Sequence, residues 1–180
     1  MHNRIGCLII HGFGGNINEV EPLISYLIEQ GYKVMAPGLK GHTGKREDLK
    51  AVKYTEWIAS AETDLLALLS DCKKVYIIGF SMGGLIAVNL GLKHRISGIV
   101  TLNTPIYYWN IKRIIINIAS DLVNRDFKYS KRYINSSKKL PFLALLNFRL
   151  LLSKTKPKVK ALKCPIFVAQ AINDDTVRKS

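Results

Sequence analysis

The sequence predicts an α/β protein with a mostly parallel sheet and helices on both faces of that sheet. Short apolar runs alternate along most of the chain with longer amphipathic stretches of helical periodicity. Each short run is apolar at nearly every position, which is typical of strands buried on both faces. With 180 residues, of which 48% are hydrophobic, the chain can form one domain with a substantial core.

Five strands and three helices are expected in this core. The strands span residues 4–10, 32–36, 74–79, 96–102 and 166–171, and the helices span 18–30, 55–69 and a stretch ending at 93. Asn18 is expected to cap the first helix and Gly31 to end it. The polar residues 39–50 are expected to form a loop.

About sixty residues between the fourth and fifth strands interrupt the alternation. They contain two helical patterns, at 109–123 and 141–152. An insertion of this size is typical of a cap over the site of an α/β core. We therefore expect residues 1–104 to form the first part of the core, 105–163 a helical cap, and 164–180 the continuation of the core. The apolar sides of the two cap helices should face the site; they comprise Ile111, Ile115, Ile118, Leu122, Leu143, Leu146 and Leu150.

The net charge of +14 is concentrated in one segment. Residues 111–163 contain fourteen Lys and Arg but only two acidic residues. No nucleic-acid motif accompanies the charge, so a solvated face of the insertion is favoured over nucleic-acid binding, and docking on an anionic membrane surface ranks below it as well. Three cysteines without paired spacing favour a reducing compartment, and the absence of a signal-peptide pattern favours the cytoplasm. No metal-ligand spacing occurs, and no metal or cofactor is expected.

A Gly-x-Ser-x-Gly pattern stands at residues 79–83, between an expected strand and an expected helix. A serine on so sharp a turn is lifted clear of the sheet, where its hydroxyl can act as a nucleophile. Gly79 and Gly83 must be small, because a Cβ at either position would collide with the neighbouring strand and helix. Ser81 is therefore the candidate nucleophile. The alternative is a glycine-rich turn with a capping serine.

A second glycine-rich turn, residues 11–15, follows the first strand. Glycines such as Gly12 let a backbone approach a reacting carbonyl closely. The Phe13 N–H and the Met82 N–H, just after the nucleophile, are the expected donors of an oxyanion hole. An ordinary turn is the alternative; a dinucleotide-binding loop lacks the G-x-G-x-x-G spacing.

Residues 173–175, Asn-Asp-Asp, follow the last expected strand. A carboxylate on a loop after a late strand can orient a catalytic histidine. Asp174 is the candidate acid, with Asp175 as its neighbour. The alternative is a surface turn with two solvated carboxylates.

Together these motifs resemble the α/β-hydrolase superfamily, and within it the small bacterial carboxylesterases and monoacylglycerol lipases. The likeness rests on HGFGGN (11–16), APGLKGH (36–42), GFSMGG (79–84), IVTLNTP (99–105) and PIFVAQAINDDTV (165–177). It implies a serine-dependent hydrolase of short or medium acyl esters or monoglycerides that needs no cofactor. It also implies the catalytic roles given above to Ser81, Phe13, Met82 and Asp174.

The sequence departs from this family at the catalytic histidine. In the family that histidine lies beyond the acid, after one more strand, whereas the histidines here are His2, His11, His42 and His94. We therefore expect a C-terminally truncated hydrolase that lacks its last strand and helix, leaves apolar sheet surface uncovered, and turns over esters barely above background. The alternative is a non-catalytic binding protein of the same fold.

Overall fold

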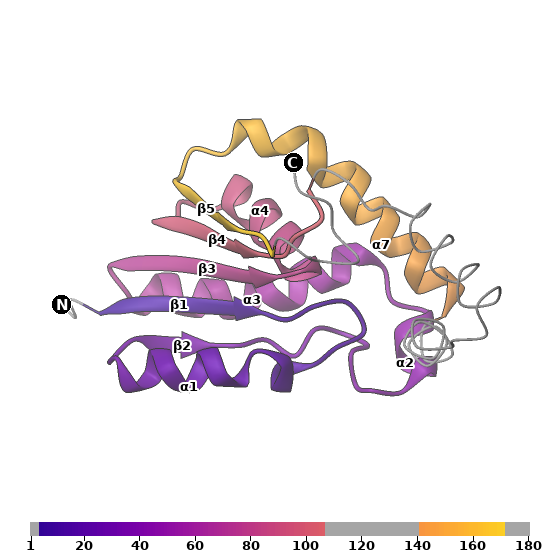
Figure 1. Cartoon of the computed structure of the whole chain (residues 1–180), viewed down its shortest axis with the longest axis horizontal. Helices are drawn as coiled ribbons and strands as arrows, with labels where there is room; N and C mark the ends of the chain where they lie inside the picture. The colour runs from indigo at the N-terminus through magenta and orange to yellow at the C-terminus, as the bar shows by residue number, and fades with distance from the viewer. Residues whose placement is uncertain (1–3, 107–140, 172–180) are drawn as a thin grey trace.

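The computed structural model describes residues 4–106 and 141–171 as twelve elements (Figure 1). They are β1 (Ile5–Ile10), η1 (Ile17–Glu19), α1 (Glu21–Glu29), β2 (Lys33–Met35), α2 (Arg46–Lys50), α3 (Tyr54–Asp71), β3 (Lys74–Phe80), α4 (Met82–Lys93), β4 (Gly98–Leu102), α7 (Phe142–Thr155), η2 (Lys156–Ala161) and β5 (Ile166–Ala169). The five strands form one parallel sheet in the order β2-β1-β3-β4-β5. The predicted fold class and all five strands are confirmed.

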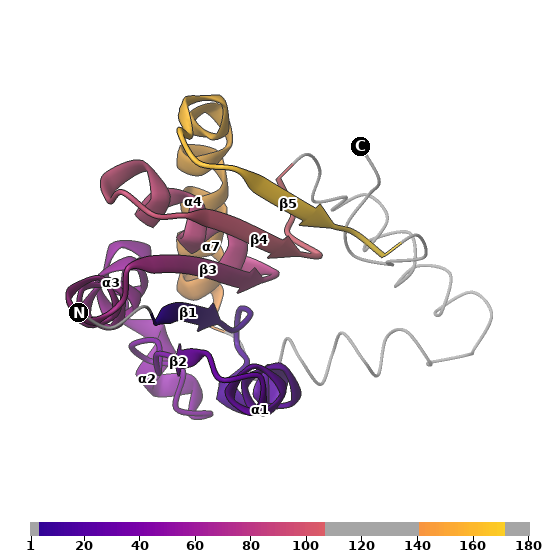
Figure 2. The ribbon, with the colours of Figure 1, turned by 90° about the vertical axis from the view of Figure 1, so that its left-hand side faces the viewer.

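Helices cover the sheet from both sides. Figure 2 shows α3, α4 and α7 on one face and α1 on the other. The inner side of α3 repeats at helical spacing, as the sequence pattern indicates. Its buried residues are Trp57, Ala61, Leu65 and Leu68. They join the apolar side chains of β1, β3 and α4 in a single core.

The strand register brings the carboxyl ends of four strands to one edge. Ile10 of β1 pairs with Gly79 of β3, and Leu102 of β4 pairs with both Phe80 and Ala169. The residues that follow these strand ends therefore emerge side by side. In an open parallel sheet, this edge is where ligands bind.

Two local expectations are wrong. The first helix begins at Glu21 rather than at Asn18, and Asn16 caps the preceding turn by accepting the Asn18 N–H at 2.9 Å. Pro22, at the start of α1, suits a first turn because its fixed φ and missing N–H cost nothing there. The expected loop at 39–50 contains the short helix α2.

The side of α7 that is buried also differs from the expectation. Its buried residues are Ala144, Phe148, Leu151 and Thr155, and they pack toward α3 and α4. The predicted site-facing residues Leu143, Leu146 and Leu150 are instead 48%, 38% and 47% exposed. The prediction for these three leucines is wrong. The isoleucines and Leu122 expected to join them lie outside the described residues.

Polar pairs in the first half and at the last residue of α7 help fix its rotation about its own axis. The Asn147 Oδ1 accepts the Tyr54 N–H at the start of α3 at 3.2 Å. Nearer the other end, the Asn89 side chain of α4 donates to the Thr155 hydroxyl at 2.6 Å. Since leucines occur all around α7, these two bonds help decide which of its sides is buried.

Replacing Phe148 by alanine should test this packing. The ring is 3% exposed, so its loss should lower the free energy of unfolding by about 3 kcal/mol. Phe142, on the same helix and 70% exposed, is the matched control, and its replacement by alanine should cost less than about 0.5 kcal/mol. Urea unfolding of both variants makes the measurement. Equal losses would contradict the burial of this side of α7.

The edge strand β5 leaves apolar surface uncovered, as expected from the sequence. Phe167 is 64% exposed and Val168 56% exposed. Within residues 4–106 and 141–171, no helix combines the length and apolar character that crossing a membrane requires.

Candidate active site

Ser81 lies on a strained turn between β3 and α4. Its backbone angles, φ 51° and ψ −114°, fall where side chains other than glycine rarely go. The Ser81 N–H donates to the Leu102 carbonyl of β4 at 2.8 Å. The neighbouring strand thus holds the nucleophile candidate in this conformation, and its side chain is only half-buried.

Neighbouring backbone atoms leave no room for a side chain at Gly79 or Gly83. A Cβ on Gly79 would come within 3.0 Å of backbone atoms of Gly83 and Gly84, and a Cβ on Gly83 would come equally close to the Ile10 carbonyl. These approaches join the first turn of α4 to the end of β1. Sequence reasoning missed the role of Gly84, whose Cβ would collide with the Thr104 hydroxyl; the only signal is the glycine doublet.

The glycine-rich turn after β1 lies against the serine turn. Phe80 is the residue before Ser81. A Cβ added to Gly12 would lie 3.4 Å from the Phe80 ring. Within the described part of the chain, neither the Phe13 N–H nor the Met82 N–H donates to a protein acceptor. Among the described residues these two backbone donors thus have no acceptor, a pattern that suits an oxyanion.

An aromatic cluster fixes the Phe13 side chain. Its ring stacks on Phe148 of α7, with centroids 5.0 Å apart and planes at 12°, and lies 5.7 Å from the Trp57 ring of α3. The His42 ring completes the cluster, 6.2 Å from Phe13 and 5.6 Å from Trp57. Spacing along the sequence gives no sign that these four rings meet, because they come from four separate segments.

Two histidines near the site are held neutral at pH 7. Burial lowers the pKa of His42 to about 4, and the neighbouring His11 lowers it further in the same direction. Burial also lowers the pKa of His11, whose Nδ1 lies 2.9 Å from the Gly12 carbonyl oxygen. The His42 Nδ1 lies 3.3 Å from the Lys40 carbonyl oxygen. Both rings are less basic than an ordinary histidine.

The chain that leads to the candidate acid is tied to the end of β4. Asn103, at φ 49°, donates its N–H to the Ala169 carbonyl at 2.9 Å, and its Oδ1 accepts the Ala171 N–H at 2.7 Å. The Leu102 carbonyl accepts the Ser81 N–H, so the end of β4 contacts both the serine turn and the segment that leads to the candidate acid. Asp174 and Asp175 themselves lie outside the described residues.

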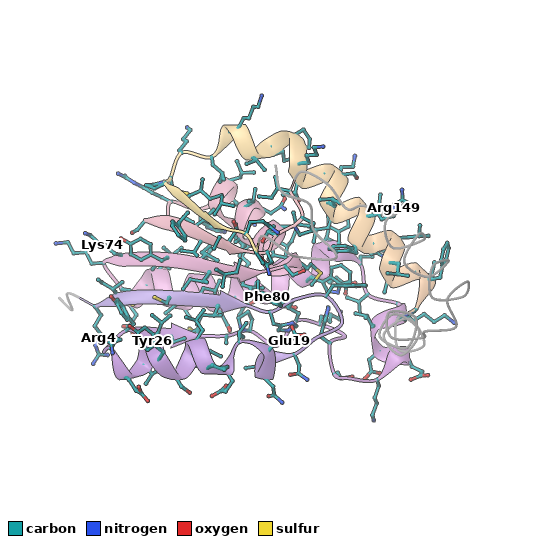
Figure 3. The ribbon with its side chains drawn as sticks, in the orientation of Figure 1. Arg4, Glu19, Tyr26, Lys74, Phe80 and Arg149 are labelled. Atoms are coloured by element: carbon teal, nitrogen blue, oxygen red, sulfur yellow. The ribbon has the colours of Figure 1, made fainter. Side chains whose placement is uncertain are left out.

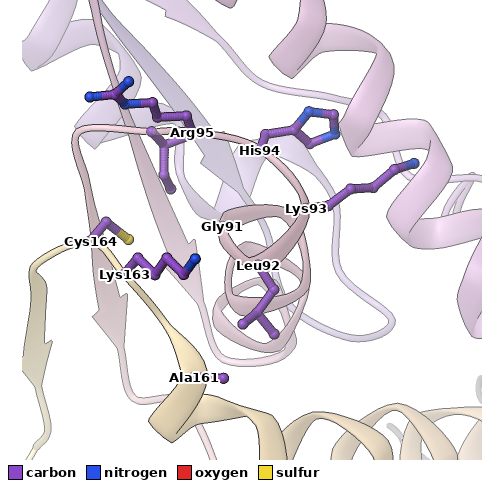
Figure 4. A pocket seen from close by; sticks show the side chains of 9 residues that line it. Gly91, Leu92, Lys93, His94, Arg95, Ala161, Lys163 and Cys164 are labelled. Atoms are coloured by element: carbon purple, nitrogen blue, oxygen red, sulfur yellow. The ribbon is translucent and has the colours of Figure 1, made fainter.

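A separate hollow of about 510 Å³ lies at the other end of α4 (Figure 4). Its lining includes Lys93, His94, Arg95 and Lys163. The twelve residues of α4 put it about 18 Å from Ser81 along the helix. His94 there pairs with Glu62 of α3, so it takes no part in the serine site. In the described part of the chain, no group of three His, Cys, Asp or Glu side chains could hold a metal ion.

Comparison with known proteins agrees with this geometry. Residues 8–173 match the family described as alpha/beta hydrolase fold. The chain is 30% identical over 184 residues to a thermostable monoacylglycerol lipase of Bacillus sp. (strain H-257), covering 96% of this chain and 72% of that protein. It is 26% identical to a carboxylesterase of Bacillus subtilis (strain 168), with 94% and 72% covered. A solved structure from work on the metagenome-derived lipolytic enzymes LipS and LipT shares the fold, with a TM-score of 0.78, 21% identity, and 98% of this chain and 75% of that chain covered.

Proposed function

This chain belongs to the alpha/beta hydrolase fold family, and from that premise we propose that it hydrolyses small carboxylic esters through an acyl-enzyme on Ser81. The strained backbone of Ser81 carries the proposal, because such strain persists only where the surroundings enforce it and is typical of catalytic turns. The substrate class follows from the relatives, a monoacylglycerol lipase and a carboxylesterase: short or medium acyl esters, or monoglycerides.

The proposed steps start from Ser81 and the two backbone N–H groups at the carboxyl edge of the sheet. The Ser81 Oγ attacks the acyl carbonyl carbon while a general base takes the hydroxyl proton. The Phe13 and Met82 N–H groups bind the oxyanion that forms on the carbonyl oxygen. The C–O bond to the alcohol then breaks, and the alcohol leaves with the proton from the base. Water repeats the sequence on the acyl-enzyme and releases the acid, with Asp174 orienting the base.

We propose that residues 105–163 form the insertion beside this site, within which α7 packs on the core helices α3 and α4. The three free cysteines, Cys7, Cys72 and Cys164, support a reducing compartment such as the cytoplasm.

None of the histidines that the structure describes suits the role of base. His11 and His42 are buried in the turn and the aromatic cluster with lowered pKa values, and His94 lies at the far end of α4. A serine hydroxyl without a base is a poor nucleophile. We therefore propose that the 180-residue polypeptide, taken alone, turns over esters slowly.

Imidazole added to the solution should supply the missing proton acceptor. We expect hydrolysis of p-nitrophenyl butyrate by the polypeptide to rise roughly tenfold or more with imidazole, a fraction of what a positioned base contributes. The rate of the Ser81→Ala variant at each imidazole concentration gives the background to subtract.

Two outcomes would contradict parts of the proposal. Fast turnover without imidazole that disappears in His42→Ala would identify His42 as the base. A rate that is the same in the wild type and in Ser81→Ala at every imidazole concentration would leave the non-catalytic binding protein as the better description.

A further inference from the structure

The carboxylate of Glu19 sits inside the glycine-rich turn. Its Oε2 accepts the Gly12 N–H at 3.2 Å. A Cβ on Gly15 would come within 3.0 Å of the carboxylate, so this residue must be glycine for the carboxylate to lie there. Glu19 belongs to the short turn η1, which Asn16 caps. The side chains of Glu19 and of Phe80, the residue before the serine, both lie against Gly12 and are labelled in Figure 3.

On the basis of the proposed function, we infer that Glu19 is a positioning residue for the oxyanion hole. Its bond to the Gly12 N–H fixes the chain one residue before Phe13, whose own N–H has no acceptor among the described residues. The stacking of the Phe13 ring on Phe148 holds the same residue from its side chain. Glu19 acts through the backbone and does not touch the substrate.

The hydrogen-bond acceptor of Glu19 positions the turn, whereas its negative charge does not help the reaction. A carboxylate near the site opposes the negative charge that develops on the substrate oxygen. The effect of that charge reaches the neighbouring His11, whose pKa it raises against the larger lowering by burial. An amide in its place keeps the acceptor and removes the charge. Glutamine at this position therefore separates the effect of the hydrogen bond on the turn from the effect of the carboxylate charge on the oxyanion.

The test compares Glu19→Ala, Glu19→Gln and Glu21→Ala. Glu21, an exposed residue of α1 bonded only to Ser25 among the residues described, is the matched control. The readouts are kcat and KM for the Ser81-dependent hydrolysis of p-nitrophenyl butyrate with imidazole present. Glu19→Ala should lower kcat about tenfold, part of the loss seen when an oxyanion donor is removed outright, with KM changed less than about twofold. Glu19→Gln should retain or exceed the wild-type kcat, and Glu21→Ala should match it.

Hydrogen exchange of the Gly12 and Phe13 amides gives a second readout that needs no turnover. The Gly12 amide should exchange faster in Glu19→Ala than in Glu19→Gln, because only the amide side chain keeps an acceptor. An unchanged kcat in Glu19→Ala, or equal losses of kcat in both Glu19 variants, would overturn the inference and leave the Ser81 mechanism intact. A wild type without any Ser81-dependent reaction would overturn both.

Discussion

Replacing Ser81 by alanine is expected to abolish covalent labelling of the protein by a fluorophosphonate. The reagent bonds to a solvent-accessible serine oxygen that has oxyanion donors next to it, and the half-buried Ser81 on its strained turn is the candidate for both. Intact mass with and without imidazole measures the label, and peptide mapping locates it. Ser153→Ala is the matched control, because that hydroxyl lies on the exposed side of α7 and bonds to the Leu150 carbonyl.

A glycine at the same position should separate catalysis from backbone strain. Ser81→Gly also removes the nucleophile, but glycine adopts a φ of 51° at no steric cost. We expect Ser81→Gly to be more stable than Ser81→Ala by about 1 kcal/mol in urea unfolding, the usual cost of a left-handed residue with a Cβ. Labelling that persists in either variant would contradict the assignment of Ser81 as the nucleophile. A glycine variant less stable than the alanine variant would contradict the backbone strain at this position.

Alanine at Gly79 or Gly83 is expected to destabilise the fold and the serine turn together. At either position the new Cβ meets backbone rather than movable side chains: Gly83 and Gly84 for the first, and the Ile10 carbonyl for the second. Relief requires β3, α4 and the end of β1 to move apart. We expect each substitution to lower the free energy of unfolding by about 3 kcal/mol, the upper range for an overpacked core, and to remove fluorophosphonate labelling.

Gly38→Ala is the matched control for these variants. A Cβ at Gly38 would have no atom within 4 Å, and its φ is not positive. Its effect on stability should stay within about 0.5 kcal/mol. A Gly79→Ala protein that unfolds like wild type and still labels at Ser81 would show that the serine turn tolerates a wider geometry than the structure has.

Much of the architecture could be predicted from the sequence because its causes are local. A run of apolar residues buries a strand on both faces wherever the sheet lies, and β1, β3 and β4 are such runs. The serine turn is equally local, since Gly79, Ser81 and Gly83 must all lie within five residues of one tight bend. The glycine-rich turn after β1 follows the same reasoning. These features depend on chain geometry that neighbouring residues determine among themselves.

The features that sequence reasoning missed depend on contacts between distant segments. The periodicity of α7 shows that it has an apolar side, but leucines surround the helix. The hydrogen bonds from Tyr54 to Asn147 and from Asn89 to Thr155 help select the buried side. No sequence motif includes Glu19, and only the fold brings its carboxylate onto Gly12. The sequence by itself therefore determined the strands, their parallel class and the serine turn. Only the tertiary structure decided how α7 is oriented, what surrounds Phe13 and His42, and what holds the glycine-rich turn after β1. These features depend on which surfaces pack together. The periodicity of one segment carries no information about the segment it packs against.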